Sequence, residues 1–201
     1  MPPRSPAPPR ERAGGPVRIV VHADEACLGN GTVPPNPGGA GGLVEVRRRS
    51  GAVERRDYFT SEPDTTNNRM ALRSAILALD LLGARGGPIA LEFVSDSQYL
   101  VRGMTEWLPG WRRREWRNVK NPELWQELAD LAETHEVCWR WVRGHAENPK
   151  NEYADFLATT AAREQRTSGK LIESGFEGWL RKEREKEKYL DFDPDAELLL
   201  D

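Results

Sequence analysis

The sequence predicts an α/β fold in which helices flank a five-stranded mixed sheet. Three consecutive segments have the apolar or alternating pattern of β-strands, and beyond them strands alternate with amphipathic helices. Strands that follow each other directly pair antiparallel, whereas strands connected through a helix pair parallel. The order β-β-β-α-β-α-α-β-α therefore predicts a sheet with both kinds of pairing. A chain of 201 residues is long enough for one such domain with further segments at its ends.

Each element has a local signal. The first strand, 17–24, is β-branched and apolar, and the next two, 41–49 and 53–61, alternate on either side of Ser50-Gly51, which predicts a hairpin. The remaining segments are, in order, a helix at 65–82, a strand at 89–96, a short helix at 97–108, a helix at 122–135, a strand at 136–145 and a helix at 148–164.

Both ends of the chain differ in composition from the domain predicted at 17–165. Residues 1–16 include six prolines and few apolar residues, so we expect a disordered arm rich in Pro and Arg. Residues 166–201 mix acidic and basic side chains, which predicts a charged extension that is helical at 177–190. The extension ends in an acidic stretch, which is a candidate to dock on a basic patch of this chain or of a partner.

The composition excludes several classes of protein. Hydrophobic residues make up 38% of the chain, the mean hydropathy is −0.69, and no apolar run reaches the ~18 residues of a membrane span. The N-terminal residues lack the apolar segment of a secretory signal. The two cysteines, Cys27 and Cys138, form no CxxC pair, which excludes the common zinc motifs and favours reduced thiols. We therefore expect a cytoplasmic protein that does not contact membranes.

Charge is distributed unevenly along the chain. The formal net charge is −3, yet the stretch 102–120 holds six basic residues against two acidic ones. A basic stretch within an otherwise acidic chain is typical of a protein that grips phosphates and also holds a divalent cation.

Three aspartates occupy positions that suggest a metal site. Asp24 and Asp96 come at the carboxyl ends of two predicted strands, and Asp155 lies in the first turns of a predicted helix. If the three meet at one edge of the sheet, their oxygens suit Mg²⁺. The competing interpretation is that each is a helix cap or an exposed loop residue, since Asp is a favoured cap.

Six motifs along the chain together resemble type 1 ribonuclease H. They are DEACLGN (24–30), TTNNRM (65–70), SDSQYL (95–100), WLPGWRRREW (107–116), VKNPELWQEL (119–128) and WVRGHAENPKNEYADFLA (141–158). The resemblance runs in order over about 17–164. It implies the ribonuclease H-like fold with its basic protrusion, and an endoribonuclease, which we expect to be a monomer. It also implies hydrolysis of the RNA strand of RNA–DNA hybrids to 5′-phosphate and 3′-hydroxyl ends, with two Mg²⁺ or Mn²⁺ ions bound together with the substrate.

The resemblance also implies roles for individual residues. Asp24, Asp96 and Asp155 match the family's metal-binding carboxylates, and His145 matches its mobile histidine, which assists proton transfer. Further positions match residues that contact the hybrid. They are Asn30, Asn67, Asn68 and Gln98 at the minor groove, and Trp107, Trp111, Arg112, Arg113, Arg114, Trp116 and Arg117 in the basic protrusion. Asn67 and Asn68 also suit a helix cap, and the Trp residues also suit a core, so both uses stay open.

Two departures affect the expected metal site. The family has a Glu at the position of Ala71, and that Glu completes the family's metal site. The family usually has Gly at the position of Glu25. Glu25 is a candidate replacement ligand, although neighbouring residues of a strand point to opposite faces. The alternative function is a hybrid-binding protein with weak or no catalysis, because Ala71 removes a ligand. Another nuclease of the same fold is a third possibility, against which the basic stretch and TTNNRM argue.

Overall fold

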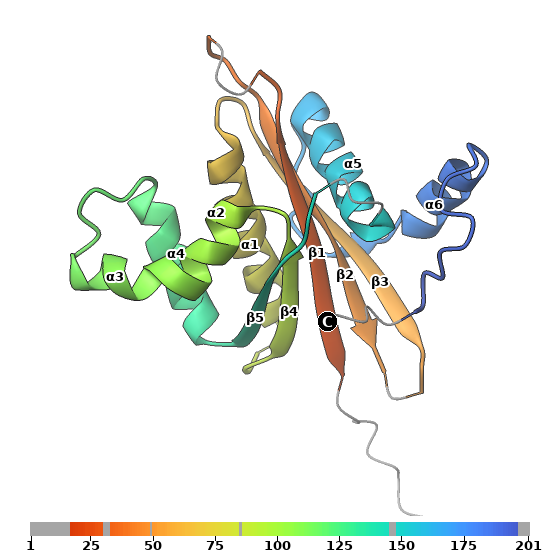
Figure 1. Cartoon of the computed structure of the whole chain (residues 1–201), viewed down its shortest axis with the longest axis horizontal. Coiled ribbons are helices and arrows are strands. Elements are labelled where there is room, and N and C mark those ends of the chain that lie inside the picture. The colour runs from red at the N-terminus through yellow and green to blue at the C-terminus, as the bar shows by residue number, and fades with distance from the viewer. Residues whose placement is uncertain (1–16, 30–32, 49, 85, 145–147, 197–201) are drawn as a thin grey trace, which may run out of the picture.

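Six strands form one mixed sheet at the centre of the molecule (Figure 1). The computed structural model describes residues 17–29, 33–48, 50–84, 86–144 and 148–196, so the arm predicted at 1–16 lies outside it. The strands are β1 (Arg18–Cys27), β2 (Gly38–Arg47), β3 (Val53–Glu62), β4 (Ala90–Ser95), β5 (Glu136–Trp141) and β6 (Ile172–Glu173), arranged in the order β5-β4-β1-β2-β3-β6.

The pairing confirms the predicted mixed sheet. β1 pairs antiparallel with β2 and parallel with β4, β2 pairs antiparallel with β3, and β4 pairs parallel with β5. The predicted number of five strands was wrong, because two residues of the C-terminal extension form β6 against β3. This short strand covers part of an edge that would otherwise leave backbone groups unpaired.

Helices cover both faces of the sheet. They are α1 (Asn67–Gly83), α2 (Gln98–Arg102), α3 (Leu108–Arg113), α4 (Pro122–Glu133), α5 (Pro149–Glu164) and α6 (Phe176–Arg184). A β-carbon added to Gly38 would lie 2.9 Å from Met70 of α1, and one added to Gly39 would lie 2.2 Å from the Ala158 oxygen of α5. Because neighbouring strand residues point to opposite faces, α1 and α5 cover opposite sides of β2.

The helix expected at 97–108 consists of three parts. A π-helical turn (Gly103–Trp107) separates α2, which packs on the body of the molecule, from α3, which protrudes from it (Figure 1). A β-carbon at Gly103 would lie 2.0 Å from the Trp125 ring, so the backbone rests directly on that ring. A π turn in this position is a local irregularity of the kind often found near functional sites.

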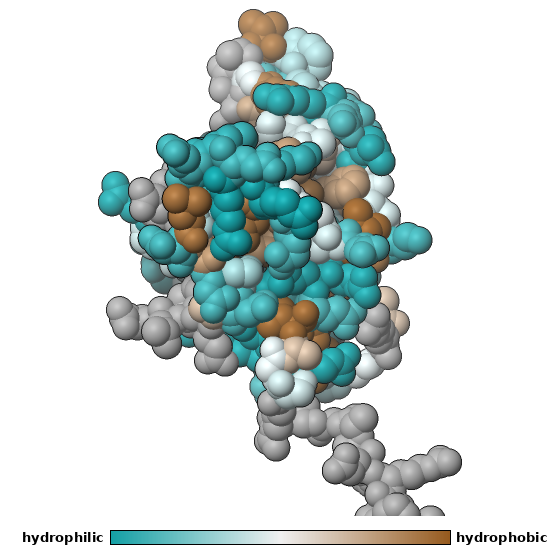
Figure 2. Space-filling model, turned by 90° about the vertical axis from the view of Figure 1, so that its right-hand side faces the viewer, coloured by the Kyte–Doolittle hydropathy of each residue, from teal (hydrophilic) through white to brown (hydrophobic). Residues whose placement is uncertain are grey.

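The main core lies between the sheet and α1 and α4, and a smaller one lies under α6. In the smaller core, Phe176 and Leu180 of α6 pack with Leu43 of β2 and Tyr153 of α5. The outer face of α5 and α6 is largely hydrophilic (Figure 2). None of the helices in the described part of the chain has the length and apolar character that a membrane crossing needs.

Besides β6, side chains of β3 bond the C-terminal extension to the sheet. The buried Asp57 carboxylate accepts hydrogen bonds from the Tyr153 hydroxyl at 2.6 Å, the Ser174 hydroxyl at 2.7 Å and the Gly175 N–H at 2.9 Å. Arg55 pairs with Asp195, with 2.7 Å between nitrogen and oxygen. The acidic stretch therefore docks on a basic residue of its own chain, which was one of the two interpretations of the sequence.

Candidate active site

Asp24 and Asp96 meet beside the end of β4. The parallel register of β1 and β4 ends at the pair Ala23 and Ser95, so Asp24 and Asp96 follow next to each other. β1 was predicted to end at residue 24, but it continues to Cys27, because β2 supplies partners for its last residues. The edge of β1 beyond Asp24 is therefore not covered by β4.

Three carboxylates gather at this uncovered edge. Oxygen atoms of Asp24, Glu25 and Asp96 all lie within 4.8 Å of one another. Asp24 and Glu25 leave the strand on opposite faces. Asp24 accepts a hydrogen bond from Asn151 of α5. Glu25 lies on the side of α1, because its charge raises the pKa of Tyr58, whose hydroxyl bonds to Ser74 of α1. Their carboxylates nevertheless meet, since both reach around an edge that no neighbouring strand occupies.

Glu25 joins this cluster where Ala71 cannot contribute. Ala71 is 1% exposed and packs in the main core among other residues of α1. Its methyl group offers no metal ligand, so within the described residues the third acid of the cluster comes from β1 and not from α1.

Mutual repulsion and burial favour the protonated carboxyls. Burial, and then the charges of Asp96 and Asp155, raise the pKa of Asp24 to about 8. Burial, and then the charges of Asp24 and Asp96, raise the pKa of Glu25 well above its ordinary value. A divalent cation would relieve this repulsion, and carboxylate oxygens are the donors that Mg²⁺ and Mn²⁺ prefer. The donor set therefore fits such an ion.

Asp155 lies on α5 near this cluster but outside its 4.8 Å limit. α5 begins where the Asn148 side chain accepts hydrogen bonds from the N–H groups of Lys150 and Asn151, at 3.1 and 3.4 Å. Asp155 follows in the second turn, half-buried, and its charge contributes to the raised pKa of Asp24. The structure thus brings Asp155 to the same site as the other three acids, at a greater distance.

Two residues around the cluster were not singled out in the sequence. Asn151 donates its side-chain N–H to Asp24 at 2.7 Å, while the backbone N–H of Glu25 donates to the other Asp24 oxygen at 2.7 Å. A β-carbon at Gly144 would lie 2.2 Å from the Asp96 carboxylate, so the chain approaches that acid closely. Both lie in the motif at 141–158, in which roles were predicted from the sequence only for His145 and Asp155. His145 lies outside the described residues.

Comparisons with known proteins decide the family. The RNase H family model matches residues 16–163. A ribonuclease H of Thiobacillus denitrificans is 45% identical over 145 residues, which cover 70% of this chain and 90% of that protein. The ribonuclease H of Halorhodospira halophila is 49% identical over 148 residues, covering 70% of this chain and 91% of that protein. The chain belongs to the ribonuclease H family. Metal-dependent hydrolysis of RNA in RNA–DNA hybrids is the general activity of this family.

A solved structure agrees with this assignment. The crystal structure of LC9-RNase H1 superposes with a TM-score of 0.78 at 49% identity, covering 82% of this chain and 81% of that one. It is described as a type 1 RNase H with the type 2 active-site motif. The family match ends at residue 163, so the whole extension of this ribonuclease H, 166–201, lies outside it.

The residues expected to contact a hybrid lie on two features of this ribonuclease H. Asn67 and Asn68 begin α1, but the helix cap is Thr66, whose hydroxyl accepts from the Arg69 N–H at 3.4 Å. Gln98, exposed at the start of α2, follows Asp96 by two residues. The Asn67 side-chain oxygen is buried with no hydrogen-bond partner in the described part of the chain. Asn30 lies outside the described residues.

The second feature is the basic protrusion. Trp107 and Trp111 pack on each other with ring centroids 5.6 Å apart, and Trp111 packs on the core residue Trp125 of α4 at 4.8 Å. Trp116 is half-buried against the main core. Four arginines of the protrusion are exposed: Arg112, Arg113, Arg114 and Arg117. Arg112 pairs with Glu133, and Arg117 pairs with Glu115. The Trp side chains therefore build the protrusion, while its arginines face outward.

The raised pKa of Asp24 predicts a pH-dependent stabilisation by Mg²⁺. Between the ordinary pKa of 3.8 and the folded value of about 8, the folded state keeps a proton that the unfolded state has released. Raising the pH through this range therefore lowers the free energy of unfolding of the metal-free protein. Metal binding displaces that proton, so we expect Mg²⁺ to raise Tm more at about pH 8 than at about pH 6. Thermal unfolding with and without Mg²⁺ measures this, and an equal rise in Tm at both pH values would contradict it.

Proposed function

We propose that this ribonuclease H cleaves the RNA strand of RNA–DNA hybrids with divalent ions held by Asp24, Glu25, Asp96 and Asp155. The observation that carries the proposal is the group of three carboxylates at the free edge of β1, with Asp155 facing it from α5. The products would carry 5′-phosphate and 3′-hydroxyl ends.

Different residues of the chain would hold the ions, orient the carboxylates and transfer protons at this site. Bound ions would supply an activated water and stabilise charge on the phosphate. Asn151 and the backbone N–H of Glu25 hold the two oxygens of Asp24, which fixes the direction of its carboxylate. The Trp141 indole donates to the Asp96 backbone carbonyl at 3.0 Å and so fixes the chain at that acid. His145 is proposed to assist proton transfer or product release.

Glu25 is proposed to take the place of the acid that Ala71 lacks. It lies within 4.8 Å of both Asp24 and Asp96, which is close enough to share an ion with them. The description of LC9-RNase H1 as a type 1 enzyme with the type 2 active-site motif supports this substitution, because it shows that the fold tolerates another set of site residues.

A second candidate function is hybrid binding with weak or no catalysis. The buried position of Ala71 favours it, since α1 supplies no ligand there. The deciding experiment is cleavage of a hybrid labelled on its RNA strand, with Mg²⁺ and with Mn²⁺. Cleavage with either ion supports the proposed nuclease. Binding without cleavage under both conditions favours the second function.

The basic protrusion is proposed to bind the phosphates of the hybrid. Replacing Arg112, Arg113 and Arg114 together by Ala should weaken binding and reduce its dependence on salt. Each lost phosphate contact should lower the slope of log K against log[salt] by about 0.7 to 0.9. Affinity measured at several salt concentrations gives this slope, and Arg166→Ala, at another exposed arginine in the extension, serves as the control. An unchanged slope in the triple variant would show that the protrusion does not contact nucleic acid.

The finer assignments are proposals of the same kind. We propose Mg²⁺ or Mn²⁺ as the ion, two ions with substrate bound, a monomer, and a cytoplasmic location. Hard oxygen donors in the site support the choice of ion.

A further inference from the structure

A buried ion pair joins the first turn of α5 to the middle of the sheet. The Lys150 ammonium donates to Glu45 of β2 at 2.7 Å, and both residues are 1% exposed. Lys150 is the second residue of α5, where the positive end of the helix dipole disfavours a cation. Burial also lowers the pKa of Lys150, because it penalises the charged form. A charge placed against both preferences suggests that its position matters.

Glu45 is held ionised by several neighbours. Burial alone would raise its pKa, but His22 and Lys150 bring the pKa of Glu45 below its ordinary value. Its second oxygen accepts from Arg55 of β3 at 2.9 Å. Arg55 in turn pairs with Glu177 and Asp195 of the extension, at 2.7 Å each. Glu45 is therefore a fixed anchor that would stay paired if Lys150 were removed.

The residue after Lys150 reaches the candidate metal site. Asn151 is 2% exposed and its side chain donates to Asp24 at 2.7 Å. Two neighbouring residues of α5 thus contact two neighbouring strands, Lys150 at Glu45 of β2 and Asn151 at Asp24 of β1. Because one turn of helix is stiff, fixing Lys150 also fixes the Asn151 amide.

We propose that Lys150 is a positioning residue, whose ion pair with Glu45 fixes the first turn of α5 so that Asn151 holds Asp24 in the orientation that binds a divalent ion. The inference rests on the proposed metal site. It assigns to this buried pair a role in metal binding beyond its contribution to the fold.

The test is a four-member cycle of full-length proteins: the parent, Lys150→Met, Asn151→Ala and the double variant. Mn²⁺ binding without substrate is measured by calorimetry, and hybrid cleavage is followed against Mg²⁺ concentration. Groups that orient a metal ligand are worth about tenfold to a hundredfold in affinity, so Asn151→Ala should weaken Mn²⁺ binding by about tenfold or more. Lys150→Met acts through Asn151 and should weaken it by about threefold to tenfold. The double variant should bind no more weakly than Asn151→Ala, because both changes remove the same interaction.

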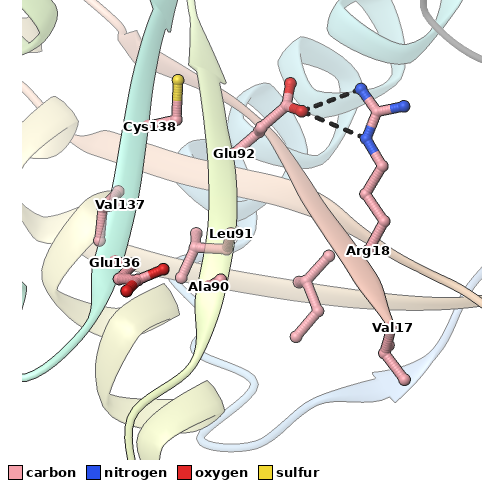
Figure 3. A pocket seen from close by; sticks show the side chains of 9 residues that line it. Val17, Arg18, Ala90, Leu91, Glu92, Glu136, Val137 and Cys138 are labelled. Atoms are coloured by element: carbon pink, nitrogen blue, oxygen red, sulfur yellow. Dashed lines mark hydrogen bonds and ion pairs between the residues drawn. The ribbon is translucent and has the colours of Figure 1, made fainter. Parts of the chain in front are cut away.

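A matched control lies at the far end of the sheet. Arg18 donates to Glu92 at 2.9 Å beside a hollow at the amino ends of β1, β4 and β5 (Figure 3). Arg18→Met also breaks an ion pair, one that is more exposed and lies away from the candidate metal site, and it should leave Mn²⁺ binding unchanged. If circular dichroism shows that Lys150→Met does not fold, Lys150→Gln takes its place with the same expectation, because its shorter, uncharged side chain also removes the ion pair with Glu45.

The outcomes separate the two claims. A parent that neither binds Mn²⁺ nor cleaves the hybrid overturns the proposed function. A parent that does both, with Lys150→Met binding Mn²⁺ as the parent does, overturns the positioning role alone. Effects that add in the double variant also overturn it, since Lys150 would then act independently of Asn151.

Discussion

Replacing Asp96 by Asn should abolish hybrid cleavage while hybrid affinity stays within about threefold of the parent. Asp96 shares the free edge of β1 with Asp24 and Glu25, and its carboxylate is one of the three that lie within 4.8 Å. The amide has nearly the same size but carries no charge, so a divalent ion loses an anionic ligand. Metal ions contribute several kcal/mol to the transition state, so the rate should fall by about a hundredfold or more. Contacts of the basic protrusion with phosphates do not involve Asp96, which is why binding should survive.

The rate is measured under single-turnover conditions on a hybrid labelled on its RNA strand, and affinity is measured on the same hybrid without metal. Asp130→Asn is a matched control, since Asp130 is exposed on α4. This control should cleave as the parent does. If Asp96→Asn keeps a rate within threefold of the parent, Asp96 is not a metal ligand.

The order of strands and helices was predictable because it follows from periodicity, which is local. The alternating segments at 41–49 and 53–61 are β2 and β3, and the spacing of apolar residues at 65–82 is α1. β6 was not predictable, since two residues carry no period, and its pairing depends on the edge that β3 leaves open. The break between α2 and α3 was missed for a similar reason. The break coincides with the contact of Gly103 with the Trp125 ring, and these two residues lie far apart in the sequence.

The site was predictable to a comparable extent. The placement of Asp24 and Asp96 at strand ends follows from parallel pairing, which sequence order implies. Whether Glu25 joins them depends on where β4 stops relative to β1, and no local pattern fixes that register. The bonds of Asn151 to Asp24 and of Lys150 to Glu45 depend on how α5 packs on the sheet, so they too were beyond reach of the sequence.

The role of Glu25 predicts the second large effect. If Glu25 replaces the acid missing at Ala71, Glu25→Ala should reduce hybrid cleavage by about tenfold or more, as the loss of a group that holds or orients a metal does. High Mn²⁺ should relieve part of that loss, because mass action compensates for weaker binding. The expected size of the effect follows from the cluster, because the Glu25 carboxylate lies within 4.8 Å of the carboxylates of Asp24 and Asp96.

The same site can be rebuilt with an acid from α1. The double change Glu25→Gly with Ala71→Glu removes the acid from β1 and adds one to α1, which is the arrangement usual in the family. It should restore cleavage to within about threefold of the parent. Ala71→Glu alone should destabilise the protein, because Ala71 is 1% exposed in the main core and the new carboxylate would be buried there. Glu25→Gly alone should cleave as slowly as Glu25→Ala.

These changes should be strongly non-additive, since ligands of one ion do not act independently. The experiment is a cycle of the parent, the two single changes and the double, each measured for cleavage rate and for Tm. The two readouts separate a lost ligand from a lost fold: the Glu25→Gly change should lower the rate with little effect on Tm, whereas Ala71→Glu should lower Tm. Equal cleavage by the parent and Glu25→Ala would make Glu25 a bystander. The site would then act with three aspartates, or with Glu62 at the end of β3 or Asp64 in the loop before α1.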